Sequence, residues 1–567
     1  MARLFDEHRI RKVKSLSGTW QMKKDADNVG RSEGWQNGLS GAHTVTVPSV
    51  WNSEIDLLTH VGTVWYEKKF YTDGGTLKLK FGAVMTEADV YFDGEYLGNH
   101  YGGFTSFEYI LENVTAGEHR INLRVNNEFD SASIPQPVLD WYYYGGITRP
   151  VELDTLNGIC VLGNIMRYTL NGNSATPTFE IDLVNATDKE ITDTVTVTVG
   201  DDYRISESVT LGAREQKTVT LSGKDIEGIE LWSPESPKLY TLLTTTSTDD
   251  LYDKVGFRTI EIHDRAVYLN GKKLMLRGIN RHEDYPDFGM AFPEMLMHKD
   301  IDIIERMGCN SIRGSHYPNN PVFVDLLDEH GITFWSEIPI WGGGFTPEQL
   351  ADPKVIERGL TMHREMVKQY YNHPSIIIWG MHNEIRSDTE EGKNISKIYY
   401  EYLKSAGGNR IVTYATNKRM LDICYEYCDM ICLNIYVGWY DNPLFKDWKD
   451  CTDKMEDYIQ KMGGGEKPVV MSEFGAAAIY GHHTFDNIKW TEEYQANLLA
   501  DCLNLFFSRP EYAGAYVWQF SDIRTSQPST DRARGYNNKG IVNEYRRPKL
   551  AYYKVSDVYN RLKSEGK

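Results

Sequence analysis

Two glutamates, Glu384 and Glu473, each follow a short apolar run and stand among amide, histidine and aromatic residues. A pair of carboxyl groups can cleave a glycosidic bond, because one protonates the departing oxygen while the other attacks the anomeric carbon. Retention of configuration requires the two groups to lie about 5–5.5 Å apart, in environments that let only one hold a proton. Either glutamate alone is compatible with a surface carboxylate or a helix cap, but the pair in these contexts predicts glycoside chemistry.

The segment after residue 263 alternates short apolar runs with helical patterns, which predicts a parallel (β/α)8 barrel. The eight expected strands are 274–279, 311–313, 333–335, 376–379, 411–413, 430–433, 469–471 and 515–518. Reactive groups of such barrels sit at the carboxyl ends of the strands. Glu384 follows the fourth strand and Glu473 the seventh, so we expect the two glutamates to face each other across the barrel mouth.

The first 262 residues predict β structure. Apolar and polar residues alternate in 76–81 and 195–199, and turn-forming clusters separate such runs. One set of strands ends near residue 157, and a second set, of the size of an immunoglobulin-like sandwich, continues to about residue 262. The expected domains are therefore 1–157, 158–262 and 263–567.

The composition of the 567 residues excludes several classes of protein. A formal net charge of −19 argues against nucleic acid as a partner. No run of eighteen apolar residues exists, so no membrane span is expected, and the first residues lack the apolar core of a signal peptide.

The seven cysteines include no CxxC pair. Cys424, Cys428 and Cys432 are spaced to share one helical face, but no histidine completes a metal-binding set. We expect buried thiols, no metal and a reduced, cytoplasmic location.

Several motifs resemble signatures of glycoside hydrolase family 2. They are 310–318 with 328–331, 372–384 ending in Glu384, 467–475 containing Glu473, 88–94 with 102–105, and 231–237. This resemblance covers nearly the whole chain. It implies a β jelly-roll for 1–157, Glu384 as acid/base and Glu473 as nucleophile. It also implies a retaining, exo-acting enzyme for β-linked sugars, without a cofactor and assembled as a dimer or tetramer.

The segment 535–541 resembles a motif of the family's β-glucuronidases, in which an asparagine and a lysine bind the sugar carboxylate. Asn537 and Lys539 occupy those positions. A lysine offers a compact positive charge with three donors, and the amide adds orientation. The arginine expected four residues before Asn537 is replaced by Ala533, and either flanking arginine, Arg532 or Arg534, is a candidate substitute.

Other predicted substrate-binding residues come from strand ends and one jelly-roll loop. Resemblance implies that Asp140 reaches the sugar hydroxyls and that the segment 434–440 lines the sugar site. The full set of these further candidates is Asp140, His316, Asn383, Asn434, Tyr436, Tyr440 and Trp518. We expect Tyr440 to hydrogen-bond the nucleophile. His316 either bonds within the core or orders the nucleophile side or a hydroxyl, and Trp518 either stacks on the sugar or packs.

The predicted function is hydrolysis of β-D-glucuronides. The missing arginine keeps β-galacturonides, or both uronides, open as substrates, and a neutral β-galactoside is a further alternative. A carbohydrate-binding homologue without catalysis predicts a damaged context around one glutamate, and the sequence has no such damage.

Overall fold

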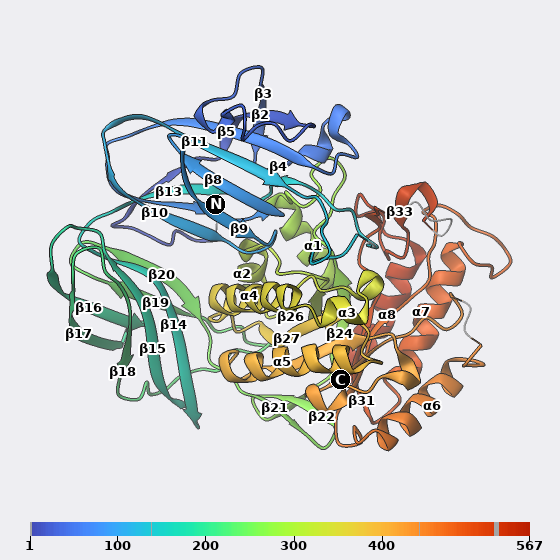
Figure 1. Cartoon of the computed structure of the whole chain (residues 1–567). Coiled ribbons are helices and arrows are strands. Elements are labelled where there is room, and N and C mark those ends of the chain that lie inside the picture. Colours follow the sequence, from blue (N-terminus) through green and yellow to red (C-terminus); the bar gives the residue numbers. More distant parts are fainter. Residues whose placement is uncertain (1–2, 138, 441–442, 527–531) are drawn as a thin grey trace.

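Two packed antiparallel sheets form the first part of the chain in the computed structural model, which describes residues 3–137, 139–440, 443–526 and 532–567 (Figure 1). The larger sheet has the strand order β3-β2-β5-β11-β8-β9, with bounds His43–Val47, Gly18–Asp25, Thr63–Thr72, Gly117–Asn126, Glu87–Phe92 and Glu95–Tyr101. The second has the order β1-β13-β6-β10, with bounds Lys12–Ser15, Val151–Leu156, Gly75–Phe81 and Phe107–Val114. Inward-facing residues such as Leu79 and Leu123 fill the core between them. This part is the N-terminal jelly-roll.

A second, smaller sandwich follows. One of its sheets contains β14 (Ile159–Asn171), β15 (Ser174–Asn185) and β18 (Gln216–Ser222). The other has the order β17-β16-β19-β20, with bounds Tyr203–Leu211, Ile191–Val199, Tyr240–Thr245 and Asp250–Val255. Apolar residues that alternate along the strands, including Ile181 and Val197, meet in its core. The predicted immunoglobulin-like sandwich is confirmed.

Eight parallel strands then close into a barrel in the order β24 to β31. Their bounds are Leu276–Arg281, Ser311–Gly314, Thr333–Glu337, Ile376–Asn383, Ile411–Thr416, Ile431–Asn434, Val469–Phe474 and Tyr512–Val517. A three-stranded sheet of β21 (Ile260–His263), β22 (Ala266–Leu269) and β23 (Lys272–Leu274) precedes the barrel. The predicted (β/α)8 fold is therefore confirmed, with all eight strands near their predicted positions.

The helices cover the outside of the barrel (Figure 1). They are α1 (Glu294–Arg306), α2 (Pro321–His330), α3 (Pro347–Leu350), α4 (Pro353–Tyr370), α5 (Glu390–Ala406), α6 (Trp448–Lys461), α7 (Glu492–Phe506) and α8 (Leu550–Ser564). In the described ranges, no helix is long and apolar enough to cross a bilayer. The apolar faces of these helices and the strands beneath them form one large core.

Between β28 and β29 the chain makes only short 3-10 turns, at Arg419–Leu421 and Tyr425–Tyr427. Cys424 and Cys428 lie in this connection and Cys432 lies on β29, so the shared helical face considered for them does not form. All seven cysteines are buried and unpaired.

A jelly-roll loop reaches the barrel mouth and joins the two domains. Its Trp141 packs against the rings of His316 and Trp341, at centroid distances of 5.5 and 5.8 Å. Close by, Arg149 donates to the carbonyl oxygens of Phe104 and Pro318, at 2.6 and 2.8 Å. These contacts hold the loop that carries Asp140 over the carboxyl ends of the barrel strands.

Candidate active site

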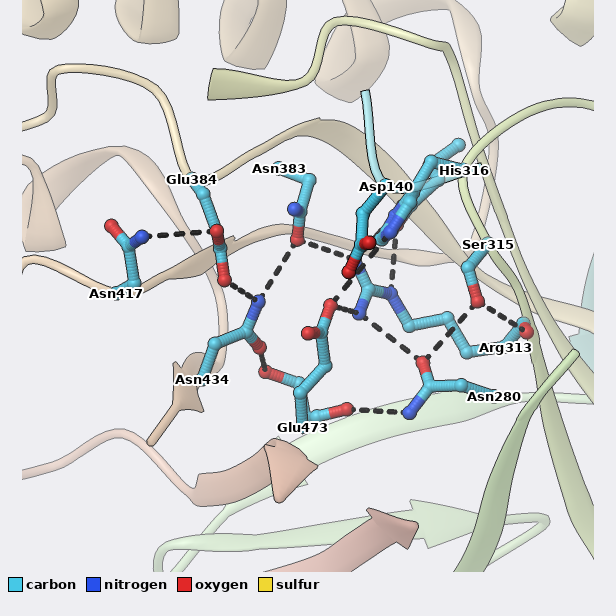
Figure 2. Close-up of polar contacts among 12 residues, drawn as sticks. Asp140, Asn280, Arg313, Ser315, His316, Asn383, Glu384, Asn417, Asn434 and Glu473 are labelled. Carbon is cyan, nitrogen blue, oxygen red and sulfur yellow. Dashed lines mark hydrogen bonds and ion pairs between the residues drawn. The ribbon is translucent and has the colours of Figure 1, made fainter. Parts of the chain in front are cut away.

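Glu473 lies near the carboxyl end of β30, where its carboxylate accepts hydrogen bonds from Arg313 and Tyr436; Figure 2 shows Arg313 beside it. Its Oε1 accepts a hydrogen bond from Arg313 Nη1 at 2.7 Å, and its Oε2 accepts one from the Tyr436 hydroxyl at 2.8 Å. Arg313 belongs to β25, and Tyr436 follows the end of β29 by two residues. Parallel strands of the barrel therefore bring the three side chains to the same mouth.

Arg313 is fully buried and divides its donors among several acceptors. It makes two hydrogen bonds to Glu337, at 2.8 and 3.0 Å, and a third to Asn383 Oδ1 at 2.8 Å. Burial disfavours its charge, but Glu337 and Glu473 together hold the pKa of Arg313 above its ordinary value. The guanidinium is a permanent positive charge beside Glu473.

Glu384 directly follows β27 and accepts from two neutral amides. Its Oε1 receives the Asn434 Nδ2 donor at 2.8 Å, and its Oε2 receives the Asn417 Nδ2 donor at 2.9 Å (Figure 2). Its backbone is left-handed, with φ of 55°, a strained conformation for a residue other than glycine. Gly342 makes this position possible, because a Cβ there would stand 1.7 Å from the Glu384 carbonyl oxygen.

The two carboxyl groups differ in their electrostatic surroundings. Burial raises the pKa of Glu473 and of Glu384 above the usual range, and the charge of Glu384 raises the pKa of Glu473 further. Arg313 opposes the effect of burial at Glu473 through direct contact, whereas the direct partners of Glu384 are uncharged. The arrangement can hold one proton between the two groups, with the negative charge beside Arg313.

A cationic corner, formed by Arg532, Asn537 and Lys539, adjoins the glutamates. Lys539 is 1% exposed, and its Nζ donates to the Tyr440 hydroxyl at 2.8 Å. The same Nζ lies 5.6 Å from the ring centre of Tyr436, the tyrosine that contacts the Glu473 carboxylate. Among the described residues, no carboxylate oxygen lies within 4.0 Å of this ammonium group.

Asp140 completes the corner from the jelly-roll loop. It accepts two hydrogen bonds from Arg532, at 2.5 and 2.6 Å, and one from Asn537 Nδ2 at 2.9 Å. Arg534 pairs with Glu544 at 2.9 Å instead, and its side chain is half exposed. Of the two flanking arginines, the structure brings Arg532 to the other candidates.

The two tyrosines of the segment 434–440 make different contacts. The prediction that Tyr440 hydrogen-bonds Glu473 is wrong, because Tyr436 makes that contact and Tyr440 meets Lys539 and Arg532. Tyr436 lies two residues after the end of β29, whereas Tyr440 lies four residues further along the chain.

Three further candidates also lie in the barrel mouth. His316 Nδ1 contacts Glu337 Oε1 at 2.7 Å, and its Nε2 is 3.9 Å from Glu473 Oε1. Burial lowers the pKa of His316 well below its ordinary value, which favours the neutral imidazole. Trp518 is buried and stacks on His316 at 5.2 Å, and Asn383 Nδ2 is a buried donor without a partner.

Several residues around the candidates were not predicted from the sequence, among them Arg313, Glu337, Asn417 and Lys418. Arg313 and Glu337 stand at the ends of the second and third predicted strands, so the strand-end rule contained a signal for both. Asn417 follows β28, whose end contributed no predicted site residue. Lys418 reaches the site only through Asn417, a contact that no sequence pattern marks.

Three family models match the chain. The TIM barrel domain of glycosyl hydrolases family 2 matches residues 260–564, the sugar binding domain of that family matches 13–157, and a third model named for the family matches 165–258. The chain therefore belongs to glycosyl hydrolases family 2, and it is a glycoside hydrolase.

The proteins to which this chain is similar include both kinds of hexuronidase. A β-glucuronidase of Paenibacillus borealis is 28% identical over 588 residues, covering 95% of this chain and 96% of that protein. A β-galacturonidase from Eisenbergiella tayi, solved with bound galacturonate, is 35% identical with a TM-score of 0.91 and 99% coverage of both chains. A β-glucuronidase from Ruminococcus gnavus, in complex with D-glucaro-d-lactam, is 25% identical with a TM-score of 0.86, covering 98% of this chain and 99% of that one.

Proposed function

We propose that this chain is a retaining, exo-acting β-hexuronidase that hydrolyses β-D-glucuronides. The observation that carries the proposal is the buried ammonium of Lys539, which has no carboxylate partner among the described residues and stands next to the Tyr436–Glu473 contact. A buried cation without a counter-charge is costly, and the carboxylate of a uronic acid would supply that charge. Asn537 adds an amide beside it.

In the proposed mechanism Glu473 is the nucleophile and Glu384 is the acid/base. A bond forms between a Glu473 oxygen and the anomeric carbon while the glycosidic bond breaks, and the leaving oxygen takes the proton of Glu384. Glu384, now ionised, removes a proton from a water molecule that attacks the anomeric carbon and releases Glu473. The Arg313 and Tyr436 contacts favour the ionised form of Glu473 before each cycle.

The proposed sugar site has a spare donor where a hydroxyl group would bind. Asn383 Oδ1 is occupied by Arg313 and Asn434, at 2.8 and 3.0 Å, so the orientation of its amide is determined. Its Nδ2 is buried without a partner. Because an unpaired buried donor is costly, we propose that it binds a sugar hydroxyl next to the glutamates.

Two observations favour a second candidate, hydrolysis of β-galacturonides. The arginine of the corner is Arg532, which is held by Asp140, and not an arginine at position 533. In addition, the Eisenbergiella tayi β-galacturonidase is 35% identical over nearly the whole chain. The two uronic acids differ only in the configuration of the 4-hydroxyl group, and Asp140 and Arg532 are the proposed groups that would distinguish them.

The test is a comparison of aryl β-glucuronide, β-galacturonide and β-galactoside, each at matched leaving group. We expect kcat/KM for one or both uronides to exceed that for the galactoside by at least about a hundredfold, because only a uronate pairs with Lys539. Equal turnover of the neutral galactoside and both uronides would refute a carboxylate-binding role for the corner.

The proposal extends to location and assembly. Seven buried, unpaired thiols support a reducing compartment, and we propose a cytoplasmic enzyme. A dimer or tetramer is proposed from family membership, and light scattering of the purified chain would test it.

A further inference from the structure

Beyond the glutamates and the cationic corner, two hydrogen bonds connect Glu384 to Lys418 at the end of β28. We call the chain Glu384–Asn417–Lys418 the relay. Lys418 Nζ donates to Asn417 Oδ1 at 2.8 Å, and Asn417 Nδ2 donates to Glu384 Oε2 at 2.9 Å. Figure 2 shows Asn417 on the side of Glu384 opposite Asn280 and Arg313. Lys418 is only partly exposed, and among the described residues no carboxylate oxygen lies within 4.0 Å of its Nζ.

We propose that Lys418 is a positioning residue for the acid/base, acting through the amide of Asn417. The inference rests on the proposed role of Glu384. An ammonium group has donors and no acceptor, so Lys418 requires the amide oxygen of Asn417 to face it. The amide nitrogen must then face Glu384. Without Lys418 the amide could turn over and present its oxygen to the carboxylate, which would oppose ionisation.

The relay also places a positive charge on the acid/base side of the site. Lys418 lowers the pKa of Glu384, against the larger effect of burial that raises it. Other charged groups that act on Glu384 are Arg313 and Asp140, and Glu473 is coupled to it. Those that act on Lys418, besides Glu384, are Asp388, Arg386 and Asp422. Because Lys418 favours the carboxylate, it assists the step in which Glu384 must act as a base.

Removal of the Lys418 charge should change the pKa of Glu384 in one direction only. In Lys418→Met the pKa of Glu384 rises, so Glu384 keeps its proton to higher pH. The alkaline limb of kcat/KM should then move up by about half a pH unit or more. Lys418→Arg keeps both the charge and the donors, and its profile should stay near that of the wild type.

The experiment measures pH profiles for the wild type, Lys418→Met, Lys418→Arg, Asn417→Ala and the double variant Asn417→Ala/Lys418→Met. If the relay passes through Asn417, adding Lys418→Met to Asn417→Ala should change kcat by less than Lys418→Met changes it alone. Lys397→Met is the matched control, since Lys397 lies on α5 and its ammonium group is 3.9 Å from the carboxylate of Glu401. Melting temperatures identify any variant that is not folded.

An unchanged alkaline limb in folded Lys418→Met, or fully additive effects in the double variant, would overturn the inference. The profiles are recorded with whichever aryl β-glycoside the wild type hydrolyses. A wild type that cleaves only the neutral galactoside would therefore refute the proposed uronide substrate and still test Lys418.

Discussion

At the scale of single residues, one guanidinium makes the two glutamates different. Arg313 contacts Glu473 directly and Glu384 only through neighbouring amides. Glu337, buried on β26, holds the other edge of the same guanidinium with two hydrogen bonds. Arg313, together with Tyr436, therefore distinguishes the proposed nucleophile from the proposed acid.

We predict that Glu473→Gln abolishes turnover of every substrate, because the nucleophile is lost. Glu384→Gln should lose most activity on glycosides with poor leaving groups, since these need the proton most. Because Glu384 must be protonated in the first step, wild-type kcat/KM falls at high pH, and this alkaline limb should disappear in Glu384→Gln. Equal losses in Glu384→Gln for alkyl and activated aryl glycosides would contradict the acid assignment.

A second prediction separates the cations of the corner. Lys539→Ala should lower kcat/KM for uronides at least about a hundredfold and leave neutral-sugar activity nearly unchanged, because its charge serves only a carboxylate. Arg532→Ala should also impair uronide turnover. Arg534→Ala is its matched control, since Arg534 pairs with Glu544 and should change turnover by less than about threefold. An Arg534→Ala effect equal to that of Arg532→Ala would show that the corner is assigned incorrectly.

At the scale of elements, the end of β27 depends on the turn η4 (Gly342–Gly344) that packs beneath it. Trp341 forms a parallel β-bridge with Asn383. The carbonyl group of Glu384 occupies the space where a Cβ atom at position 342 would lie. The left-handed conformation of Glu384 persists because this turn supports it. A loop with no catalytic side chain thereby sets the position of one.

Gly342→Ala should displace Glu384, because the new Cβ would stand 1.7 Å from its carbonyl oxygen. We expect kcat/KM to fall about tenfold or more, since small misplacements of catalytic groups are costly. Gly163→Ala, on β14, is the control: its Cβ would find its nearest neighbour at 3.9 Å. Steady-state kinetics and melting curves of both variants test the prediction, and wild-type kinetics in Gly342→Ala would exclude this support.

At the scale of the whole molecule, buried arginines join the domains. Arg258, between the immunoglobulin-like sandwich and the barrel, donates to the carbonyl oxygens of Pro374, Ile376 and Asn409 at 2.7–2.8 Å. Burial lowers its pKa. At the junction between the jelly-roll and the barrel, Arg149 likewise donates to the carbonyl oxygens of Phe104 and Pro318. The candidate active site combines residues of two domains, so these junctions support its geometry.

Arg258→Ala should lower the melting temperature by about 5 °C or more, because three barrel carbonyl groups would lose their donor. The Michaelis constant should change little, since the three acceptors lie at the amino ends of β27 and β28, opposite the mouth of the barrel. Arg204→Ala, at an exposed position of β17, is the control and should melt like the wild type. A melting temperature unchanged in Arg258→Ala would mean that this junction does not stabilise the molecule.

The sequence by itself determined the elements and the family. Short apolar runs at a regular spacing predicted all eight barrel strands, because buried parallel strands require such runs and reactive groups follow their ends. Glu384 and Glu473 were recognisable for the same reason. The domain limits at 157 and 262 stay predictions, as do the roles of the site residues.

Only the tertiary structure decided which side chains meet. Nothing in the spacing of Tyr436 and Tyr440 showed which one contacts Glu473, or that Arg532 and not Arg534 joins Asp140. Asp140 and Arg532 are 392 residues apart, and Lys418 reaches Glu384 through an intervening amide. Such contacts depend on loop paths and side-chain directions that the whole packed molecule sets, so local sequence patterns do not contain them.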